Sequence, residues 1–252
     1  MVMITIKYHK NHLKRTDIFF AKRPKMKHLI GFYDYFQCKS INTIFGFKRI
    51  NCYTKLIDLT KSPEELLGLF SNTTRYEIKR SFKDGTKYSI EENFDSFIDF
   101  YNKFARSNNL ELIESSYLVS FGNNLFISKG VHDDECLVMH ANIMDHDFKR
   151  VRILLSASHF RKVSDRQKRA LIGRVNRFLH FKDMIFAKNM NIERYDLGGY
   201  ALNSEDKILQ GINKFKNGFG GELKRESNYT PYLIWILRKL KRFMNFYILS
   251  SH

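Results

Sequence analysis

The segment from Asn191 to Tyr229 constrains the fold of this chain more than any other part of the sequence. It opens with a short apolar run that ends in D-L-G-G at Asp196 to Gly199, which is typical of a buried strand followed by a sharp turn. Isoleucine and phenylalanine then recur at helical spacing up to G-F-G-G at Gly218 to Gly221, where glycines end a helix. The segment therefore predicts a strand, a turn, a helix and a second strand, in that order.

The composition is that of a folded protein with one or two domains. Of the 252 residues, 43% are hydrophobic and 15% are aromatic, and there are three prolines, which argues against disorder. The formal net charge of +17, from 43 Lys and Arg against 26 Asp and Glu, favours polyanionic partners such as RNA, anionic lipid or phosphorylated substrates. A surplus of this kind also serves solubility alone.

Cysteine usage and hydropathy favour a cytoplasmic protein with reduced thiols. Cys38, Cys52 and Cys136 are odd in number and widely spaced, which supports neither a zinc site nor a disulfide framework. The N-terminal residues carry charge early and lack the apolar core of a signal peptide. The longest uncharged apolar-rich run, Ser227 to Leu237, is far shorter than the roughly 20 residues that a spanning helix needs.

The first ninety residues carry three runs that predict strands, at Met3 to Tyr8, Ile41 to Phe47 and Cys52 to Leu59. Ser62, followed by proline and two glutamates, predicts a helix start with Ser62 as its N-cap. Thr74 lies three residues before a glutamate and predicts a second helix start with capping-box spacing.

The pattern from Phe94 onward predicts a helix, three strands, a long helix, a strand, a helix and a strand. The three strands, at Leu125 to Val131, Cys136 to Met144 and Phe148 to Ser156, are separated by Asp-rich turns and form an antiparallel meander. The long helix runs from about Ser164 to Asn189. We therefore expect an α+β fold with a mixed, largely antiparallel sheet flanked by helices.

Three segments resemble motifs of one enzyme family. Thr74 to Arg80 looks like the basic helix near the start of the family's core, and Arg174 to His180 looks like its R-x-N-x-x-L-H helix. The pair formed by D-L-G-G and F-K-N-G-F-G-G, the latter at Phe215 to Gly221, looks like its C-terminal half. Over roughly Asn72 to Tyr229, the chain therefore resembles the Fem-type aminoacyltransferases, a branch of the GNAT acyltransferase superfamily.

The resemblance implies a division of the chain into three parts. Residues 91–230 would form a GNAT-like acyltransferase domain, preceded by an abbreviated GNAT-like subdomain at residues 1–90. Residues 231–252 read as a basic amphipathic C-terminal helix that either packs on the domain or lies on an anionic membrane surface.

The D-L-G-G turn has two interpretations. In the first, Asp196 takes part in catalysis, while Tyr195 and the amides of Gly198 and Gly199 line the acyl-transfer cleft. In the second, Asp196 only bonds local amides of a tight turn.

The lysine of the F-K motif also has two interpretations. The resemblance implies that Lys216, beside Phe215, holds the aminoacyl ester or the oxyanion that develops during transfer. Alternatively, Lys216 is a cation in the last turn of a helix, where it complements the dipole.

Polar side chains on the meander are further candidates. His140 and Asn142 share one face of a strand because strand side chains alternate, and Ser156 and Ser158 share a face of the next strand. His140 has the ordinary pKa of a general base near neutral pH, although a lone strand histidine is also a common structural residue.

Asn176, His180 and Asp183 form one stripe of the long helix. Asn176 and His180 are candidates for binding the acceptor. The alternative is that the stripe is a solvated or locally hydrogen-bonded face.

The donor is open between acyl-CoA and aminoacyl-tRNA. The segment before the long helix lacks the glycine loop by which GNAT enzymes hold the pyrophosphate of acyl-CoA at a helix N-terminus. Basic side chains would then hold the donor phosphates, or else form a solvated turn; they are Arg161, Lys162, Arg166, Lys168 and Arg169.

The resemblance implies an enzyme that transfers an acyl or aminoacyl group to an amine, such as one on a cell-envelope glycan or peptidoglycan precursor. It implies the donor as a cosubstrate, with no permanently bound cofactor and no metal. Partners would be the donor, including tRNA, and a lipid-linked acceptor at the inner face of the membrane. The competing function is a non-catalytic GNAT-like module that binds RNA or anionic membrane through its basic surface.

Overall fold

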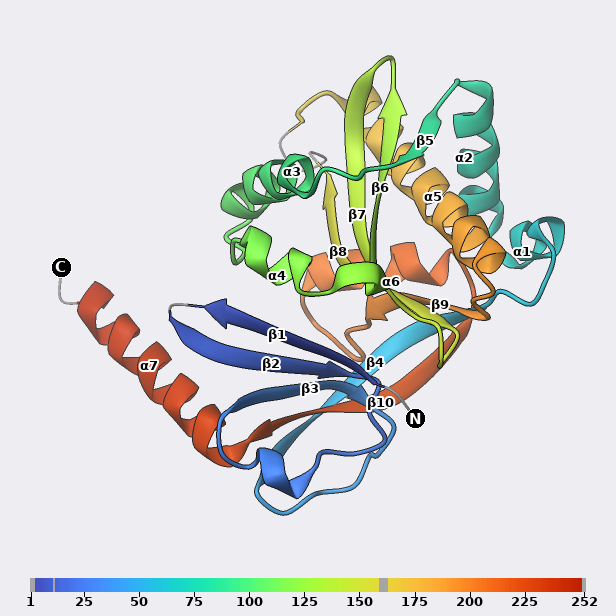
Figure 1. The fold of residues 1–252 in the computed structure, drawn as a ribbon. Coiled ribbons are helices and arrows are strands. Elements are labelled where there is room, and N and C mark those ends of the chain that lie inside the picture. The colour runs from blue at the N-terminus through green and yellow to red at the C-terminus, as the bar shows by residue number, and fades with distance from the viewer. Residues whose placement is uncertain (1–2, 11, 159–162, 251–252) are drawn as a thin grey trace. The chain divides into compact units, whose positions relative to one another are not determined.

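A computed structural model of the protein describes residues 3–10, 12–158 and 163–250, with only the backbone of residues 242–250. The chain forms two compact units (Figure 1). Unit 1 contains Met1–Tyr53 and Arg225–His252, and unit 2 contains Thr54–Lys224. None of the helices in these described residues is long and apolar enough to cross a membrane.

Unit 1 is built on strands in the order β1-β2-β3-β10. Its elements are β1 (Ile4–Lys10), β2 (Leu13–Phe19), the short helix η1 (Met26–His28), β3 (Phe32–Cys38), β10 (Glu222–Pro231, which begins in unit 2) and α7 (Tyr232–Ser250). β1 and β2 are antiparallel, β2 and β3 are parallel, and β3 and β10 are antiparallel. Its core includes the fully buried side chains of Tyr35, Phe47 and Tyr229.

Unit 2 contains strands in the order β4-β9-β8-β7-β6-β5. Its strands are β4 (Phe47–Asp58, which begins in unit 1), β5 (Lys87–Ile90), β6 (Leu125–His132), β7 (Glu135–Asp145), β8 (Arg150–Ser158) and β9 (Arg194–Gly199). All neighbours are antiparallel except β8 and β9, which are parallel.

Helices cover both faces of the unit 2 sheet (Figure 1). They are α1 (Pro63–Leu69), α2 (Asn72–Lys83), α3 (Phe94–Ser107), α4 (Ser115–Val119), η2 (Gly122–Asn124), α5 (Arg166–Asn189) and α6 (Lys207–Asn217). α5 packs on one face through Val175 and Leu179, and α3 packs on the other through Phe97 and Tyr101. The expected α+β fold, with its largely antiparallel sheet and its meander β6-β7-β8, is confirmed.

Several local expectations need correction. Residues 41–46 form a loop, and the strand begins at Phe47, because Gly46 has a φ of +78° that a strand does not contain. Helix α2 begins at Asn72, three residues before the expected start, because the Ser71 hydroxyl caps it by accepting from the Thr74 amide. Strands β2 and β3 were not predicted. Ser62 caps α1 with the full capping box, as expected.

The compact units also differ from the expected division at residues 90/91 and 230/231. β10 pairs with β3, so the end of the chain joins the N-terminal strands in unit 1. Residues 54–90 instead belong to unit 2, where α2 packs against α5 and β5 pairs with β6.

The turn after α6 gives a test of this packing. Gly221 has a φ of +79°, and a Cβ there would lie 2.5 Å from the carbonyl oxygen of Leu56. We expect Gly221→Ala to lower the free energy of unfolding by about 2 kcal/mol or more, since left-handed backbone and a backbone clash add. Chemical denaturation measures this loss.

Gly211 provides the matched control, because it lies within α6 and no described atom lies within 4 Å of an added Cβ. Gly211→Ala should raise the free energy of unfolding by about 0.5–1 kcal/mol through helix propensity. Equal losses in the two variants would contradict this account of Gly221.

Candidate active site

The candidate site lies where the parallel strands β8 and β9 stop pairing. They pair over Arg150–Arg152 and Arg194–Asp196. Beyond this point β8 continues along β7, and β9 continues along β4 to Gly199. Leu154 is an additional residue in β8, where the register with β7 shifts, and such a bulge bends the strand. The backbone groups of both strands past Arg152 and Asp196 are therefore outside the β8–β9 ladder.

Asp196 ties three strands together at this point. Its side chain is fully buried, and its Oδ2 accepts hydrogen bonds from Nη2 and Nε of Arg150 at 2.5 and 3.2 Å. Its Oδ1 accepts from the Thr54 hydroxyl of β4 and from the Gly198 amide at 2.8 Å. The Thr54 hydroxyl oxygen also lies 2.9 Å from the carbonyl oxygen of Gly198. These contacts match the local-turn interpretation and make Asp196 an anchor of the turn.

Lys216 lies over the turn that Asp196 holds. The amine of Lys216 donates a hydrogen bond to the carbonyl oxygen of Gly199, and a Cβ on Gly198 would lie 3.9 Å from that nitrogen. Burial lowers the pKa of Lys216 to about 8, with a further lowering by Arg152, against the attraction of Asp196. The amine is therefore a cation at neutral pH that loses its charge within the range of an ordinary assay.

Gly199, the last residue of D-L-G-G, differs from the glycines of F-K-N-G-F-G-G in its surroundings. It is exposed, and none of the described atoms lies within 4 Å of the position its Cβ would take. Gly218, in contrast, would bring a Cβ within 2.4 Å of the Thr74 hydroxyl. The Gly199 backbone is therefore open beside the Lys216 amine.

An aromatic cluster supports the helix that carries Lys216. The ring of His180 on α5 packs against Phe215 and Phe219, with ring centres 5.5 and 5.2 Å apart. The hydroxyl of Tyr195 and Nδ1 of His180 are hydrogen-bonded at 2.9 Å. The guanidinium of Arg177 lies 4.8 Å from the centre of the Phe215 ring.

Burial and neighbouring charges set the protonation of this cluster. Burial lowers the pKa of His180 well below its ordinary value, and His140, Lys216 and Arg177 lower it further. Burial likewise raises the pKa of the Tyr195 hydroxyl. The pair is therefore neutral, and it positions α6 without supplying a proton.

His140 belongs to a second, buried network. Its Nδ1 contacts Asp183 at 2.8 Å, and its Nε2 contacts the amide oxygen of Asn176 at 3.0 Å. The His140 side chain has no exposed surface, and Asn142 shares its face as expected. With both nitrogens engaged in the core, His140 is placed to position α5 and not to meet a substrate.

The contacts of Asp196 and those of His140 lie on opposite faces of the sheet. His140 and Tyr195 reach side chains of α5, whereas Asp196 follows Tyr195 directly and so points the other way. The stripe of Asn176, His180 and Asp183 faces the sheet, where His180 and Asp183 are buried and Asn176 is half-buried.

Other candidates lie apart from Lys216 or are engaged locally. Ser156 pairs with His140, and Ser158 pairs with Val138, on half-exposed parts of β8. At the start of α5, the Asp165 carboxylate caps the amides of Gln167 and Lys168. Among the basic candidates, Arg166 and Arg169 lie in the first turn of α5, and Lys168 pairs with Glu135 at 2.8 Å. Arg161 and Lys162 lie outside the described residues.

Sequence reasoning missed Thr54, Arg150, Arg152 and Arg177. Arg150 and Arg152 share a strand face at i and i+2, which is a readable signal once β8 is placed. Thr54 is distant in sequence, and no local pattern links it to Asp196. No group of described side chains could hold a metal ion as three or more His, Cys, Asp or Glu ligands.

Comparison of the structure with solved structures identifies its fold. FemX superposes with a TM-score of 0.61 at 12% identity, covering 89% of this chain and 83% of FemX. This is the fold of FemX. The expected resemblance to Fem-type proteins is therefore confirmed at the level of the fold.

Two further structures share the FemX fold. L-PGS from Bacillus licheniformis has a TM-score of 0.58 at 10% identity, covering 90% of this chain and 84% of its own. The C-terminal domain (DUF2156) of a protein described as a lysylphosphatidylglycerol synthetase from Agrobacterium fabrum has a TM-score of 0.58 at 13% identity, covering 90% and 80%. No protein-family model and no curated protein sequence matches the chain.

His180 gives a pH-dependent test of the cluster. Its pKa is lowered in the folded protein, so below the ordinary value of 6.5 the unfolded chain binds a proton that the folded chain excludes. We expect this residue to reduce the free energy of unfolding by about 1.4 kcal/mol for each pH unit below 6.5. Denaturation of the wild type and His180→Gln across pH 5 to 8, on the order of the range in which histidine titrates, measures this.

His180→Gln should flatten the acid side of the stability profile. His9→Gln, on the exposed side of β1, is the matched control and should leave the profile unchanged. An unchanged profile for His180→Gln would show that His180 accepts a proton without loss of packing.

Proposed function

We propose that this protein is an N-acyltransferase that moves an acyl or aminoacyl group from an activated donor to an amine. The observation that carries the proposal is the Lys216 amine at the open Gly199 backbone, where β8 and β9 separate. The fold shared with FemX supports the same reaction class, and the F-K motif places a lysine at this position of the chain.

The chemistry follows from the cation and the turn. The acceptor nitrogen attacks the acyl carbon, a C–N bond forms, and the carbonyl oxygen becomes an oxyanion. The C–O or C–S bond to the donor then breaks, and the departing oxygen or sulfur takes the proton that the amine gives up. The Lys216 cation stabilises the oxyanion in a partly desolvated setting, where a fixed charge has most effect.

The remaining residues position the reactants. Asp196 is a positioning residue that holds the turn, and His140 is a positioning residue beneath α5. Phe215 and the Gly199 backbone are accessible enough to contact the acyl group, whereas Tyr195 and Gly198 act through the turn. Asn176, Ser156 and Ser158 are half-exposed and remain candidates for the acceptor.

The start of α5 favours an aminoacyl-tRNA donor over acyl-CoA. The Asp165 carboxylate already occupies the amides that a pyrophosphate would use, and it repels a phosphate there. The basic side chains of Arg166 and Arg169 suit a polynucleotide backbone instead. The proposed acceptor is an amine of a cell-envelope glycan or peptidoglycan precursor.

The reaction class is tested by incubating the protein with aminoacyl-tRNAs and acyl-CoAs as donors, and with amino sugars and lipid-linked precursors as acceptors. Transfer from any donor supports the proposal, and transfer from acyl-CoA alone would reverse the donor preference. Tight binding of RNA without transfer in any combination would favour the non-catalytic module.

Lys216→Ala tests the role of the cation. Loss of one oxyanion donor costs about 2.7–4 kcal/mol of transition-state stabilisation, so we expect kcat/KM to fall by about a hundredfold or more. Lys214→Ala is the matched control, because Lys214 lies two residues away on the exposed side of α6. Thermal unfolding should be nearly unchanged in both. Equal, small losses of activity in the two variants would show that Lys216 only complements the helix dipole, an interaction that stabilises the fold by about 0.3–1 kcal/mol.

The pH profile gives an independent test. Because the pKa of Lys216 is lowered to about 8, the cation is lost as the pH rises above that value. We expect kcat/KM to fall above about pH 8 in the wild type and to hold to higher pH in Lys216→Arg, since arginine stays charged. If kcat/KM falls in the same way at high pH in both proteins, a group other than Lys216 is responsible for the fall.

A further inference from the structure

One end of unit 1 is formed by three segments that contain no acidic residue. They are residues 20–33, residues 39–53 and residues 227–241. All three carry lysine and arginine, so this end of the unit has a strongly positive potential. Charge of one sign over a continuous surface attracts a partner of the opposite sign.

The loops of the first two segments present large apolar side chains to solvent. Ile30 and Phe45 are each 84% exposed, far more than side chains of this kind in a folded protein usually are. The loops that carry them touch, because the Leu29 side chain lies against Gly46. Two apolar tips therefore project beside one another from a basic surface.

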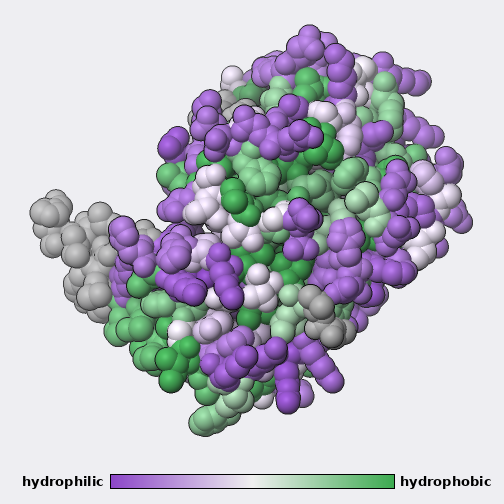
Figure 2. All heavy atoms as spheres, in the orientation of Figure 1, coloured by the Kyte–Doolittle hydropathy of each residue, from purple (hydrophilic) through white to green (hydrophobic). Residues whose placement is uncertain are grey.

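The third segment adds an apolar helix face beside these tips. The amide of Tyr232, the first residue of α7, donates to the carbonyl of Gly46 at 2.9 Å. The helix docks through the buried Ile234 and through a bidentate pair between Arg238 and Asp34 at 2.8 and 2.6 Å. Its opposite side exposes an apolar row at helical spacing: Leu233, Ile236, Leu237 and Leu240. Figure 2 shows apolar side chains gathered around the start of α7.

Cations flank this apolar surface. Lys48 and Lys239 lie 5.2 and 4.4 Å from the centre of the half-exposed Trp235 ring. A tryptophan beside lysines on an amphipathic helix is typical of the boundary between water and lipid.

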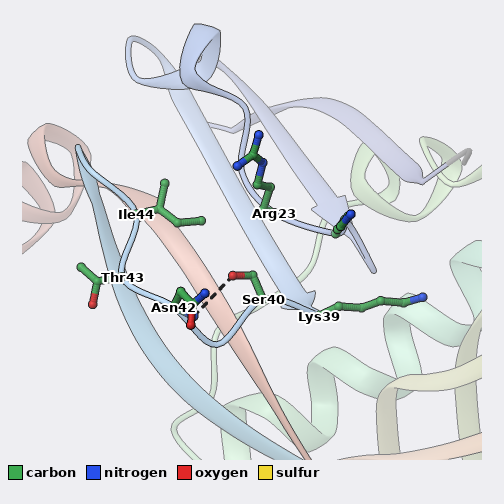
Figure 3. Close-up of a pocket in the computed structure, with 7 residues that line it drawn as sticks. Arg23, Lys39, Ser40, Asn42, Thr43 and Ile44 are labelled. Carbon is green, nitrogen blue, oxygen red and sulfur yellow. Dashed lines mark hydrogen bonds between the residues drawn. The ribbon is translucent and has the colours of Figure 1, made fainter.

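A pocket of about 680 Å³ in the same unit is lined by basic, hydroxyl, amide and aliphatic side chains (Figure 3). Its cations are Lys22, Arg23 and Lys39. The buried Tyr229 holds one wall in place, since its hydroxyl lies within hydrogen-bonding distance of the carbonyl oxygens of Ser40 and Asn42, at 3.0 and 2.6 Å. The wall is therefore preformed, and its chemistry suits a phosphate group.

We infer that this end of unit 1 docks on an anionic lipid surface. The loop tips and the exposed face of α7 enter the headgroup region, and the basic pocket takes a lipid phosphate. The exposed Ile30 and Phe45 side chains favour a lipid surface over RNA, because RNA offers no apolar phase that could cover them. The inference goes beyond the proposed transfer reaction and does not depend on it.

Vesicle binding tests the inference without any transfer assay. The full chain is mixed with vesicles of phosphatidylcholine, with or without phosphatidylglycerol, and flotation measures binding. The single tryptophan, Trp235, reports contact through a blue shift of its emission. We expect binding to the anionic vesicles alone, weakening as salt is raised.

Two variants separate the apolar and the basic contributions. Ile30→Ser with Phe45→Ser should weaken binding by about tenfold or more, because both side chains leave water on docking. Lys22→Ala, Arg23→Ala and Lys39→Ala together should weaken it by about fivefold for each charge removed. The matched control is Leu110→Ser with Val119→Ser in unit 2, whose side chains are 47% and 56% exposed.

Circular dichroism melting confirms that each variant is folded before binding is compared. Loss of binding in the control to the same extent as in the loop-tip variant would overturn the inference. So would a wild type that ignores anionic vesicles at low salt. Tight RNA binding that is unaffected by the loop-tip variant, in a protein that leaves vesicles unbound, would assign the surface to nucleic acid and also overturn it.

Discussion

The buried Asp196 carboxylate is the interaction on which the geometry of the candidate site depends. It accepts hydrogen bonds from Thr54 on β4, from Arg150 on β8 and from the Gly198 amide in the turn after β9. A carboxylate removed from water is costly unless its charge and lone pairs are satisfied, so these parts are held in one relative placement. That placement sets the direction of the Gly199 carbonyl, and the Lys216 amine binds to that carbonyl.

The glycines of D-L-G-G and F-K-N-G-F-G-G are of two kinds. Some are needed for packing between segments, and one has open space beside it. Gly218 and Gly221 would each bring a Cβ to within 2.5 Å of another segment, so packing alone accounts for them. Gly199 has no such neighbour among the described atoms, and it lies beside Lys216, whose pKa burial lowers to about 8. Glycines that look alike in sequence therefore differ in the structure, and only Gly199 bears on the proposed acyl transfer.

Local patterns predicted most elements of unit 2 because alternation and helical spacing act over a few residues, but they missed the short helices α4 and η2. Local patterns did not identify the N-cap of α2 correctly, because Ser71 and Thr74 are both residue types that cap helices. Ser71 caps α2, and Thr74 is buried within it. Relations across the sheet were beyond local pattern. That His140 and Asp196 lie on opposite faces depends on strand register and on a bulge in β8. Strand β3 pairs with β10, far along the chain, which no local signal indicates.

The net charge of +17 indicated a polyanionic partner but not which cations would meet it. In unit 2, Arg150 pairs with Asp196 and Arg177 with Glu77, so these charges are largely neutralised over short distances. Burial makes the charge of Lys216 dependent on pH, which suits a reacting group better than a docking surface. The acid-free end of unit 1 carries its charge on loops and on a terminal helix, where attraction acts over about 10 Å at ordinary salt. The two proposals therefore assign separate roles to positive charge: stabilisation of an oxyanion by Lys216, and attraction of unit 1 to an extended anionic surface.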